Sequence, residues 1–589
     1  MRSLLVAMCM ALAAAIPAFP AHAETYSYAD AIRETAWVEL DVDLDRDGHR
    51  DRLAADVIRP AEPAASGLKV PVLMDISPYY ACCGRGNEAQ KKTYDADGKP
   101  TGFPLYYDNY FVPKGYAVVL VDMSGTNRST GCMDRGGRHD VAAGAQVVNW
   151  LNGRARAYTE PFGGEPVAAG WSTGAVGIWG KSHDGWLANG IATTGVRGLK
   201  TVVSIAGNTD IYRTYNANGA WRGYVRTDDG PPRLYNERAM RLCKPFTEEL
   251  NRLEGSDGDW NRYWQERDYP GKADRVRASV FVTQGFGDYA VAASNFSLWW
   301  QALRVPRKAW LFQGGHVDPF DLRRADYVRT VERWFDRWLR GVDNGVDREP
   351  AVTIEHAPDQ WREEQAWPAA GARPRTWWPG QDGLSTAPPP ASARATFQDD
   401  PDIGRFEWVK EGPSNHRLLY RSEPLAADTR LSGTGRITVT MKSSTPVARV
   451  GIAVVDYGPA TIRDYVDITG TGGIRTLTTR SCWGEGSATD SACYLDTETA
   501  TTTVDHEIVA TGWADLGHHA TLRRGMPLNP ERFYTMSFDL SPLDHVVPAG
   551  HRIGLVIGGT DYWEFLEPGQ RPTLTVDLAR TTLTLPTVG

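Results

Sequence analysis

The chain has 589 residues, more than one hydrophobic core usually holds, so we expect two or three domains. Hydrophobic residues make up 42% of it, charged residues 23%, and the formal net charge is -8. This balance lacks the basic excess that nucleic acids and anionic membrane surfaces attract, so neither is expected as a partner.

The segment 1–23 has the pattern of a secretory signal peptide. Arg2 supplies a positive charge, residues 4–19 form a short apolar stretch, and Ala21-His22-Ala23 matches a small-x-small cleavage site. The apolar stretch is too short to span a membrane comfortably, and no later segment offers about 20 apolar residues. We therefore expect an exported protein that lies in the periplasm or outside the cell.

An acidic loop, DLDRDGHRD, begins at Asp43. It matches the first nine positions of a D-x-D-x-D-G-x-x-D calcium loop, but Ala54 stands where a calcium-binding Glu is expected. Two interpretations stay open. The loop is either a weak calcium site, formed by Asp43, Asp45, Asp47 and Asp51, or an acidic β-turn between two strands.

From about residue 69 the chain alternates between short apolar runs and amphipathic helices. The runs predicted to be strands are 69–76, 116–122, 175–179, 199–205, 279–283 and 309–312. This alternation indicates a mostly parallel sheet covered on both faces, hence an α/β domain over residues 24–366. The polar and aromatic stretch 208–275 interrupts the alternation and is predicted to be an inserted helical cap.

The sequence changes character in its last third. Residues 367–391 are rich in Pro, Gly and Ala and are predicted to be a linker. Thr- and Val-rich alternating runs then fill residues 392–589, for example at 436–441 and 553–557. Short strands separated by turn residues are typical of a β-sandwich.

The sequence has 7 cysteines, of which Cys9 lies in the signal segment. The even number that remains favours disulfides in an oxidising compartment. Cys482 and Cys493 bracket a loop rich in Gly, Ser and Asp and are the preferred pair. Cys82 or Cys83 is expected to pair with Cys132, since both segments follow predicted neighbouring strands.

Two serines compete for the role of nucleophile. Ser172 lies in a literal G-x-S-x-G motif, but it precedes a predicted strand. Ser182 lies in Gly-Lys-Ser-His-Asp-Gly, with the second glycine one residue late, yet it falls directly between a buried strand and a helix. Because the nucleophile of an α/β-hydrolase sits on a sharp strand-to-helix turn, the context favours Ser182.

A serine needs a base, and the base needs an orienting acid. In this fold the order along the chain is Ser, then Asp or Glu, then His. Asp288 follows the strand 279–283 on a Gly-rich turn, and His316 follows the strand 309–312 and a Gly-Gly turn. We predict that Ser182, Asp288 and His316 form a catalytic triad.

An acyl-transfer enzyme also needs two donors for the developing oxyanion. The backbone N–H of His183 is the first candidate, because it follows the nucleophile. The second should come from the loop after the strand 69–76, where the Tyr79 hydroxyl is a candidate. The residues alone leave this open and favour a packed aromatic side chain at Tyr79.

These motifs together resemble the Xaa-Pro dipeptidyl-peptidase family and the related cocaine-esterase-like hydrolases. The matching segments are Ser77-Pro78-Tyr79, Gly180-Lys181-Ser182, Gly287-Asp288, Gly315-His316-Val317-Asp318-Pro319-Phe320 and Pro548-Ala549-Gly550-His551-Arg552. The resemblance implies an α/β-hydrolase domain with a helical cap and a C-terminal jelly-roll sandwich. It also implies that Ser182, Asp288 and His316 are the triad and that the Tyr79 hydroxyl is an oxyanion donor.

The stretch that selects the substrate departs from the family pattern. Tyr212 and Tyr215 are retained as candidate walls of a proline pocket, but the Trp and the terminal Arg of the family run are absent. Release of N-terminal dipeptides also requires an acid for the substrate ammonium. The candidates, which the sequence does not rank, are Asp228, Asp229, Glu237, Glu248 and Glu249.

We therefore expect a serine dipeptidyl-peptidase that acts on peptides with a free N-terminus and proline in second place. The alternative is an esterase or amidase of the cocaine-esterase-like type that acts on small acyl compounds. A catalytically silent sugar-binding or adhesion protein is disfavoured by the complete triad. No cofactor is expected, and a homodimer is one option for the oligomeric state.

Overall fold

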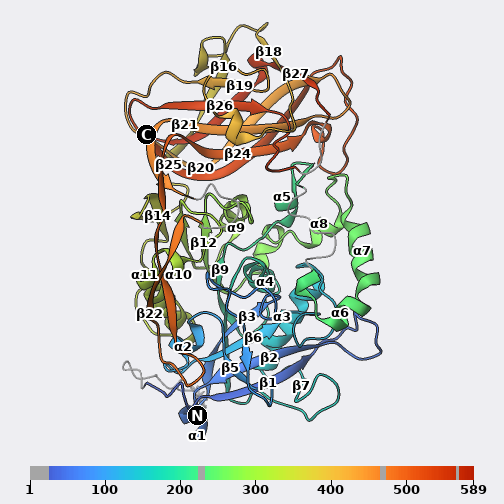
Figure 1. Cartoon of the computed structure of the whole chain (residues 1–589), viewed down its shortest axis with the longest axis vertical. Coiled ribbons are helices and arrows are strands. Elements are labelled where there is room, and N and C mark those ends of the chain that lie inside the picture. Colours follow the sequence, from blue (N-terminus) through green and yellow to red (C-terminus); the bar gives the residue numbers. More distant parts are fainter. Residues whose placement is uncertain (1–24, 223–231, 465–471, 566–569) are drawn as a thin grey trace, which may run out of the picture.

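The computed structural model describes residues 25–222, 232–464, 472–565 and 570–589. An α/β domain contains the elements from residue 32 to residue 364, and a domain of strands follows it along the long axis of the molecule (Figure 1). The predicted signal segment 1–23, together with Asp228 and Asp229, lies outside the described residues. Within the described residues, no helix is long and apolar enough to cross a membrane.

The α/β domain is built on one large mixed sheet. Its parallel strands, in spatial order, are β6 (Ala117–Asp122), β3 (Val70–Ser77), β8 (Ser172–Lys181), β9 (Leu199–Ile205), β12 (Ser279–Gly285), β13 (Arg307–Phe312) and β14 (Val352–Ala357). Antiparallel strands complete both edges: β2 (Arg52–Arg59), β1 (Ile32–Glu39) and β7 (Ala157–Tyr158) on one side, β15 (Gln360–Glu364) on the other.

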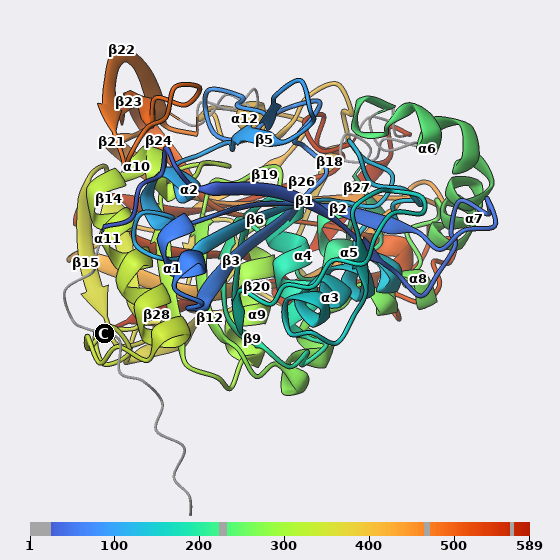
Figure 2. The same cartoon turned by 90° about the horizontal axis from the view of Figure 1, so that it is seen from below.

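Both faces of this sheet are buried, as the continuous apolar runs predict. Along β3, Val72 and Met74 belong to one core cluster, whereas Leu73 between them belongs to the other. The first cluster is covered by α3 (Arg138–Leu151), α4 (His183–Ala192) and α9 (Ser294–Ala302), and the second by α2 (Tyr107–Phe111) and α11 (Arg324–Phe335). Figure 2 shows α3 and α11 on opposite sides of the strands.

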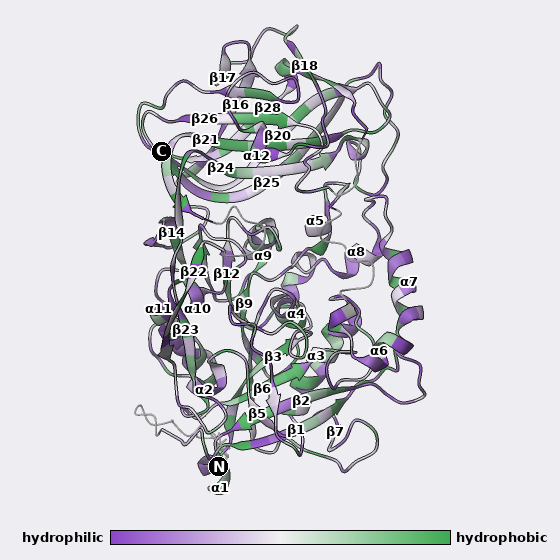
Figure 3. Ribbon diagram, in the orientation of Figure 1, coloured by the Kyte–Doolittle hydropathy of each residue, from purple (hydrophilic) through white to green (hydrophobic). Residues whose placement is uncertain are grey.

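The segment 208–275 stands between β9 and β12 and holds mainly short helices. They are α5 (Ile211–Tyr215), α6 (Glu237–Leu242), α7 (Lys244–Glu254) and α8 (Arg262–Glu266), with a short β10 (Asn216–Ala217) and β11 (Ala220–Trp221) pair. Helix α7 is strongly hydrophilic, in contrast to the apolar strands of the sheets (Figure 3). Only Leu250 and Glu254 of α7 are buried.

The C-terminal domain consists of two sheets that share one apolar core. One sheet contains β16 (Ala372–Gly380), β17 (Gly383–Ser385), β18 (Arg394–Gln398), β20 (Thr429–Ser443), β25 (Tyr534–Val547), β27 (Thr573–Asp577) and β28 (Thr582–Val588). The other contains β19 (Leu418–Arg421), β21 (Arg449–Arg463), β24 (Thr501–Asp515) and β26 (Arg552–Gly558). Ile437 of β20 and Ile452 of β21 lie in the same cluster, so the sheets pack face to face.

The prediction of a linker at 367–391 is wrong. This stretch contains β16 and β17, and β16 pairs with β28 from Ala372 to Trp377. The two prolines of β16 are tolerated because each residue of this strand pairs on one side only, with β28 over Ala372–Trp377 and with β17 over Trp378–Gly380. Composition alone did not reveal that a Pro-rich stretch closes the edge of a sheet.

The disulfide predictions are confirmed for one pair and wrong for the other. Cys482 and Cys493 join the strands β22 (Ile474–Cys482) and β23 (Cys493–Thr499), as expected. Cys132, however, pairs with Cys243, and Cys82 pairs with its neighbour Cys83. The inserted segment brings Cys243 to within 5.5 Å (Cα–Cα) of Cys132, a contact between residues 111 positions apart.

The hairpin β22–β23 extends from the C-terminal domain along the α/β domain, beside α10 (Pro319–Leu322) (Figures 1 and 2). Thr497 Oγ1 donates a hydrogen bond to the Asp321 carbonyl at 2.7 Å, and Arg324 Nη2 donates to the Leu495 carbonyl at 2.9 Å. At its base, the Gly315 amide donates to the Gly472 carbonyl at 3.1 Å. The C-terminal domain therefore contacts the loop that carries His316.

Candidate active site

Ser182 lies on the turn between β8 and α4 with φ 62° and ψ -121°. The backbone of a non-glycine residue with a positive φ is strained, and the turn closes only if the neighbouring residues are small. A Cβ on Gly185 would lie 2.9 Å from the Gly180 carbonyl oxygen, and a Cβ on Gly180 would lie 2.6 Å from the backbone of Asp184. The close approach thus needs glycine three residues after Ser182, which explains the departure from G-x-S-x-G.

Ser172 is the first residue of β8, at the opposite end of this strand from Ser182. Its side chain is 5% exposed, and its Oγ accepts a hydrogen bond from the Gly174 amide at 3.0 Å. Ser172 therefore starts a strand and closes a local turn, whereas Ser182 has the strand-to-helix geometry of a nucleophile.

Asp288 and His316 follow the neighbouring strands β12 and β13 and meet at 2.8 Å, Oδ2 to Nδ1. The other carboxylate oxygen of Asp288 accepts hydrogen bonds from the amides of Ala290 at 2.9 Å and Val291 at 2.8 Å. These bonds fix the carboxylate, whose Oδ2 then holds the Nδ1–H tautomer of His316. Such a histidine has Nε2 available as a base.

Tyr79 follows β3, the parallel neighbour of β8, so the turn of Ser182 and the loop of Tyr79 lie at the same edge of the sheet. Burial raises the pKa of the Tyr79 hydroxyl, while hydrogen bonding to the Ser182 side chain and to the His183 backbone partly lowers it. The hydroxyl therefore stays protonated at neutral pH. The Tyr79 hydroxyl and the His183 amide meet beside Ser182, where an oxyanion would need them.

The His183 side chain is a buried neutral group. Burial lowers its pKa to about 4, and its Nε2 has no hydrogen-bond partner among the described residues. Its ring lies edge-on to Tyr79, with centroids 6.5 Å apart, and against Trp186 at 4.9 Å. The imidazole thus supports the Tyr79 ring by packing and adds no positive charge.

A buried ion network connects the Tyr79 loop with the helix that follows Ser182. Arg85 Nη1 lies 2.9 Å from Asp75 Oδ2 and also contacts Asp184. The Tyr80 hydroxyl donates to the same Asp75 oxygen at 2.8 Å. Arg85 and both acids are nearly inaccessible to solvent, so their charges depend on each other for compensation. The sequence showed no pattern that would single out Arg85.

The two predicted tyrosines of the pocket have different surroundings. Tyr212 is 3% exposed and donates a hydrogen bond to the Gly258 carbonyl at 2.8 Å, which anchors it inside the inserted segment. Tyr215 packs against Trp264 with ring centroids 6.2 Å apart. Burial raises the pKa of the Tyr215 hydroxyl, and Tyr215 and Tyr79 pack against the same core cluster.

Of the five acids predicted to bind the substrate ammonium, Asp228 and Asp229 lie outside the described residues. Glu237, Glu248 and Glu249 are exposed on α6 and α7. Glu254, which the sequence reasoning missed, is 5% exposed at the end of α7 and pairs with Arg135 at 3.1 Å. The charge of Glu254 raises the pKa of the Tyr215 hydroxyl, and the charge of Arg135 lowers it. An acid at the end of a helix carries no sequence signal for such a position.

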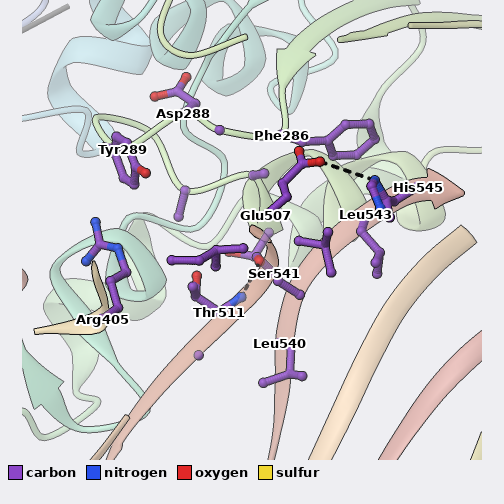
Figure 4. Close-up of a pocket in the computed structure, with 18 of the residues that line it drawn as sticks. Phe286, Asp288, Tyr289, Arg405, Glu507, Thr511, Leu540, Ser541, Leu543 and His545 are labelled. Atoms are coloured by element: carbon purple, nitrogen blue, oxygen red, sulfur yellow. Dashed lines mark hydrogen bonds and ion pairs between the residues drawn. The ribbon is translucent and has the colours of Figure 1, made fainter. Parts of the chain in front are cut away.

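A cavity of about 960 Å³ lies between the Asp288 loop and the C-terminal sheets. Figure 4 shows Phe286, Asp288 and Tyr289 facing strand residues such as Glu507 and His545. The lining contains neither Ser182 nor His316, so the cavity adjoins the Asp288–His316 pair only through the Asp288 loop. The acids of the predicted calcium loop lie between β1 and β2 and take no part in this site.

Comparison with known proteins decides the family. The profile of the X-Pro dipeptidyl-peptidase (S15) family matches residues 47–318, and that of the X-Pro dipeptidyl-peptidase C-terminal non-catalytic domain matches 344–587. A Streptomyces avermitilis relative assigned to the Xaa-Pro dipeptidyl-peptidases is 48% identical, over 96% of this chain and 85% of that protein. This chain belongs to the Xaa-Pro dipeptidyl-peptidase family.

Membership of this family confirms the resemblance predicted from the motifs and makes the protein a serine-type peptidase. The Xaa-Pro dipeptidyl-peptidase of Lacticaseibacillus rhamnosus is 28% identical, over 96% of this chain and 78% of that protein. Among solved structures, a CocE/NonD family hydrolase from Staphylococcus aureus has a TM-score of 0.66 at 14% identity, covering 95% of this chain and 94% of the other. This likeness shows a shared fold.

Proposed function

We propose that this protein is an exported serine dipeptidyl-peptidase that removes Xaa-Pro dipeptides from the N-termini of peptides. The observation that carries the proposal is the strained Ser182 turn, with the Tyr79 hydroxyl beside it and the Asp288–His316 pair on two nearby strand ends. The family to which the chain belongs supports the same reaction class.

In the proposed mechanism, His316 Nε2 takes the proton of Ser182 as the Ser182 Oγ attacks the carbonyl carbon of the substrate proline. The His183 amide and the Tyr79 hydroxyl donate to the resulting oxyanion. The imidazolium, stabilised by Asp288, then gives its proton to the leaving amine, and the C–N bond breaks. Water, deprotonated by His316, hydrolyses the acyl-enzyme and restores Ser182.

For the free N-terminus, we propose that Glu254 accepts the substrate ammonium. Three features support this assignment: the Glu254 carboxylate is buried, its charge helps to raise the pKa of Tyr215, and Tyr215 and Tyr79 pack against the same core cluster. The Arg135 guanidinium, 3.1 Å away, orients the carboxylate. An ammonium bound at Glu254 would place the second residue of the substrate toward Ser182, which suits release of dipeptides.

Two finer features of the fold belong to the same proposal. The helices of the segment 208–275 would act as a cap over the turn of Ser182, and the two C-terminal sheets would form a jelly-roll sandwich. The Cys132–Cys243 disulfide supports the first point, since it joins the inserted segment to the α/β domain. The shared core of the two sheets supports the second.

Export is proposed from the signal pattern, and the three disulfides suit an oxidising compartment. Mass spectrometry of the protein recovered outside the cytoplasm is expected to give a chain that starts at Glu24. Recovery of the uncleaved chain in the cytoplasm would refute export without touching the catalytic proposal.

The catalytic proposal is tested with three substrates: Ala-Pro-p-nitroanilide, its N-blocked counterpart and p-nitrophenyl butyrate. We expect turnover of the free-amine anilide, at least 10²-fold weaker turnover of the blocked one, and complete loss in Ser182→Ala. Turnover of the ester alone would instead establish the esterase alternative.

A second variant tests the site for the ammonium. Glu254→Gln is expected to raise the KM for Ala-Pro-p-nitroanilide about 10- to 100-fold, because a charge-assisted hydrogen bond is lost. Glu248→Gln, which alters an exposed acid of the same helix, serves as the control. Equal KM values for the two variants would remove Glu254 from the proposal and leave the triad in place.

A further inference from the structure

The acidic loop between β1 and β2 brings three carboxylates together. Oxygen atoms of Asp43, Asp45 and Asp51 all lie within 4.8 Å of one another. These residues occupy the first, third and ninth positions of the calcium-loop pattern, so the structure assembles the positions that the spacing singles out. Asp47, at the fifth position, lies outside this group and contacts Arg238.

The loop is held in shape by its own backbone. The amides of Asp47 and Gly48 donate to the two carboxylate oxygens of Asp43, at 3.2 and 3.0 Å, and the Leu44 amide donates to Asp51 Oδ2 at 2.9 Å. Gly48 adopts φ 89°, which a side chain would disfavour. These bonds order the loop in the absence of an ion, so ion binding requires little further ordering of the chain.

One oxygen of this cluster is buried without a partner. Asp51 is 1% exposed, and its Oδ1 has no hydrogen-bond partner among the described residues. A buried carboxylate oxygen without a donor is costly, and several acids close together increase the cost. Arg238 on α6 offsets part of it, because its Nε donates to Asp45 Oδ2 at 3.0 Å, but it does not reach Asp51 Oδ1.

We propose that this loop binds one Ca²⁺, with carboxylate oxygens of Asp43, Asp45 and Asp51 as ligands. Calcium is favoured because the donors are hard oxygens in an irregular arrangement, whereas Mg²⁺ requires near-ideal octahedral geometry. The Glu of the twelfth position is absent, which places the expected dissociation constant in the range of about 10⁻⁴ to 10⁻³ M of extracellular sites.

The ion would strengthen a junction between three parts of the chain. Asp45 also accepts a hydrogen bond from the Gly131 amide at 3.3 Å, next to Cys132 and its disulfide with Cys243. The β1–β2 loop, the loop at Gly131 and helix α6 therefore meet at the same acids. Arg238 and the ion both neutralise Asp45, so they compete for it.

The test uses the mature protein after treatment with a chelator. Addition of 5 mM CaCl₂, about five or more times the expected dissociation constant, should raise the Tm by about 1–3 °C, and MgCl₂ should raise it less than half as much. Asp51→Asn should abolish the rise. In the absence of calcium, this variant should melt at or above the wild-type Tm, because it removes the unpaired charge.

Further variants make each result decisive. Asp43→Asn should also abolish the rise, while Asp41→Asn, two residues away and with a side chain 77% exposed, should keep it. Arg238→Gln should lower the calorimetric dissociation constant for Ca²⁺ several-fold, since a competing cation is lost. No calcium-dependent rise in the wild type, or a full rise in Asp51→Asn, would overturn the proposal. Dipeptidase activity is not used as a readout, so the two proposals fail independently.

Discussion

Arg85 connects the two segments that supply the proposed oxyanion donors, the Tyr79 loop and the start of α4. It joins Asp75, at the end of the strand before Tyr79, to Asp184, in the first turn of the helix after Ser182. A buried charge network of this kind fixes geometry, but losing one member leaves uncompensated charge. The distance from the Tyr79 hydroxyl to Ser182 therefore depends on a residue outside the predicted triad.

Removing the hydroxyl of Tyr79 tests its role at the residue scale. Tyr79→Phe is expected to lower kcat about 10²- to 10³-fold with a nearly unchanged KM, because one donor to the oxyanion is lost and the ring is retained. Steady-state kinetics with Ala-Pro-p-nitroanilide measures this. A decrease below threefold would show that the oxyanion has other donors.

Arg85 is predicted to be a positioning residue. Arg85→Lys keeps the charge, but its ammonium cannot take the position of Nη1, the nitrogen that contacts both acids, so kcat should fall about 10-fold or more while KM changes little. A higher kcat in Arg85→Lys than in Arg85→Met would show that Arg85 positions the site and is not merely required for folding. The exposed Arg348→Lys is the matched control. Identical kinetics of Arg85→Lys and wild type would exclude the positioning role.

At the scale of elements, the Cys132–Cys243 disulfide links the loop before α3 to the junction of α6 and α7. Helix α7 ends at Glu254, the residue proposed to bind the substrate ammonium. Most of α7 is exposed, so apolar packing contributes little to its placement. The disulfide therefore supplies much of the restraint on this helix.

Paired replacement of Cys132 and Cys243 by Ala is expected to lower the free energy of unfolding by about 2–4 kcal/mol. It should also raise the KM for the free-amine anilide more than it lowers kcat, since α7 moves and the triad does not. Replacement of Cys482 and Cys493, which close an 11-residue separation, should cost less stability and leave KM unchanged. Denaturant titration measures the free energy of unfolding of each double variant, and steady-state kinetics measures its KM. An equal change of KM in the two double variants would contradict the claim that the Cys132–Cys243 disulfide positions α7.

At the scale of the whole molecule, the C-terminal domain supports the α/β domain in two places. The segment at Gly472 bonds to Gly315, next to His316, and the hairpin β22–β23 lies along α10 (Figure 1). On the side of the C-terminal domain, strands β24 and β25 form a wall of the cavity of Figure 4. His545 of this wall donates to Asp456 Oδ2 at 2.8 Å and lies 3.9 Å from Glu507.

This wall should make stability depend on pH. Burial lowers the pKa of His545, but the hydrogen bond to Asp456 and the charges of Glu507 and Asp544 outweigh burial, so its pKa is raised. The pKa of an unfolded histidine is about 6.5, and below this pH the protonated His545 stabilises the folded state in full. This stabilisation is lost as the pH rises through the higher pKa of His545 in the folded state. The Tm should therefore fall above pH 6.5, and His545→Gln should flatten this slope. An unchanged slope in the variant would exclude His545.

The sequence by itself determined what depends on local periodicity and local turns. Continuous apolar runs predicted the buried strands, and the position of Ser182 between a strand and a helix predicted its strained turn, because both depend on neighbouring residues. The Cys482–Cys493 pair followed in the same way from a short hairpin loop.

Only the tertiary structure decided what depends on residues far apart in the chain. Cys243 reaches Cys132, and Glu254 reaches Arg135, because the inserted segment packs against the loop before α3. The Pro-rich stretch 367–391 forms β16 because β28, from the other end of the domain, pairs with it. Such contacts depend on the packing of whole elements, and no local pattern encodes them.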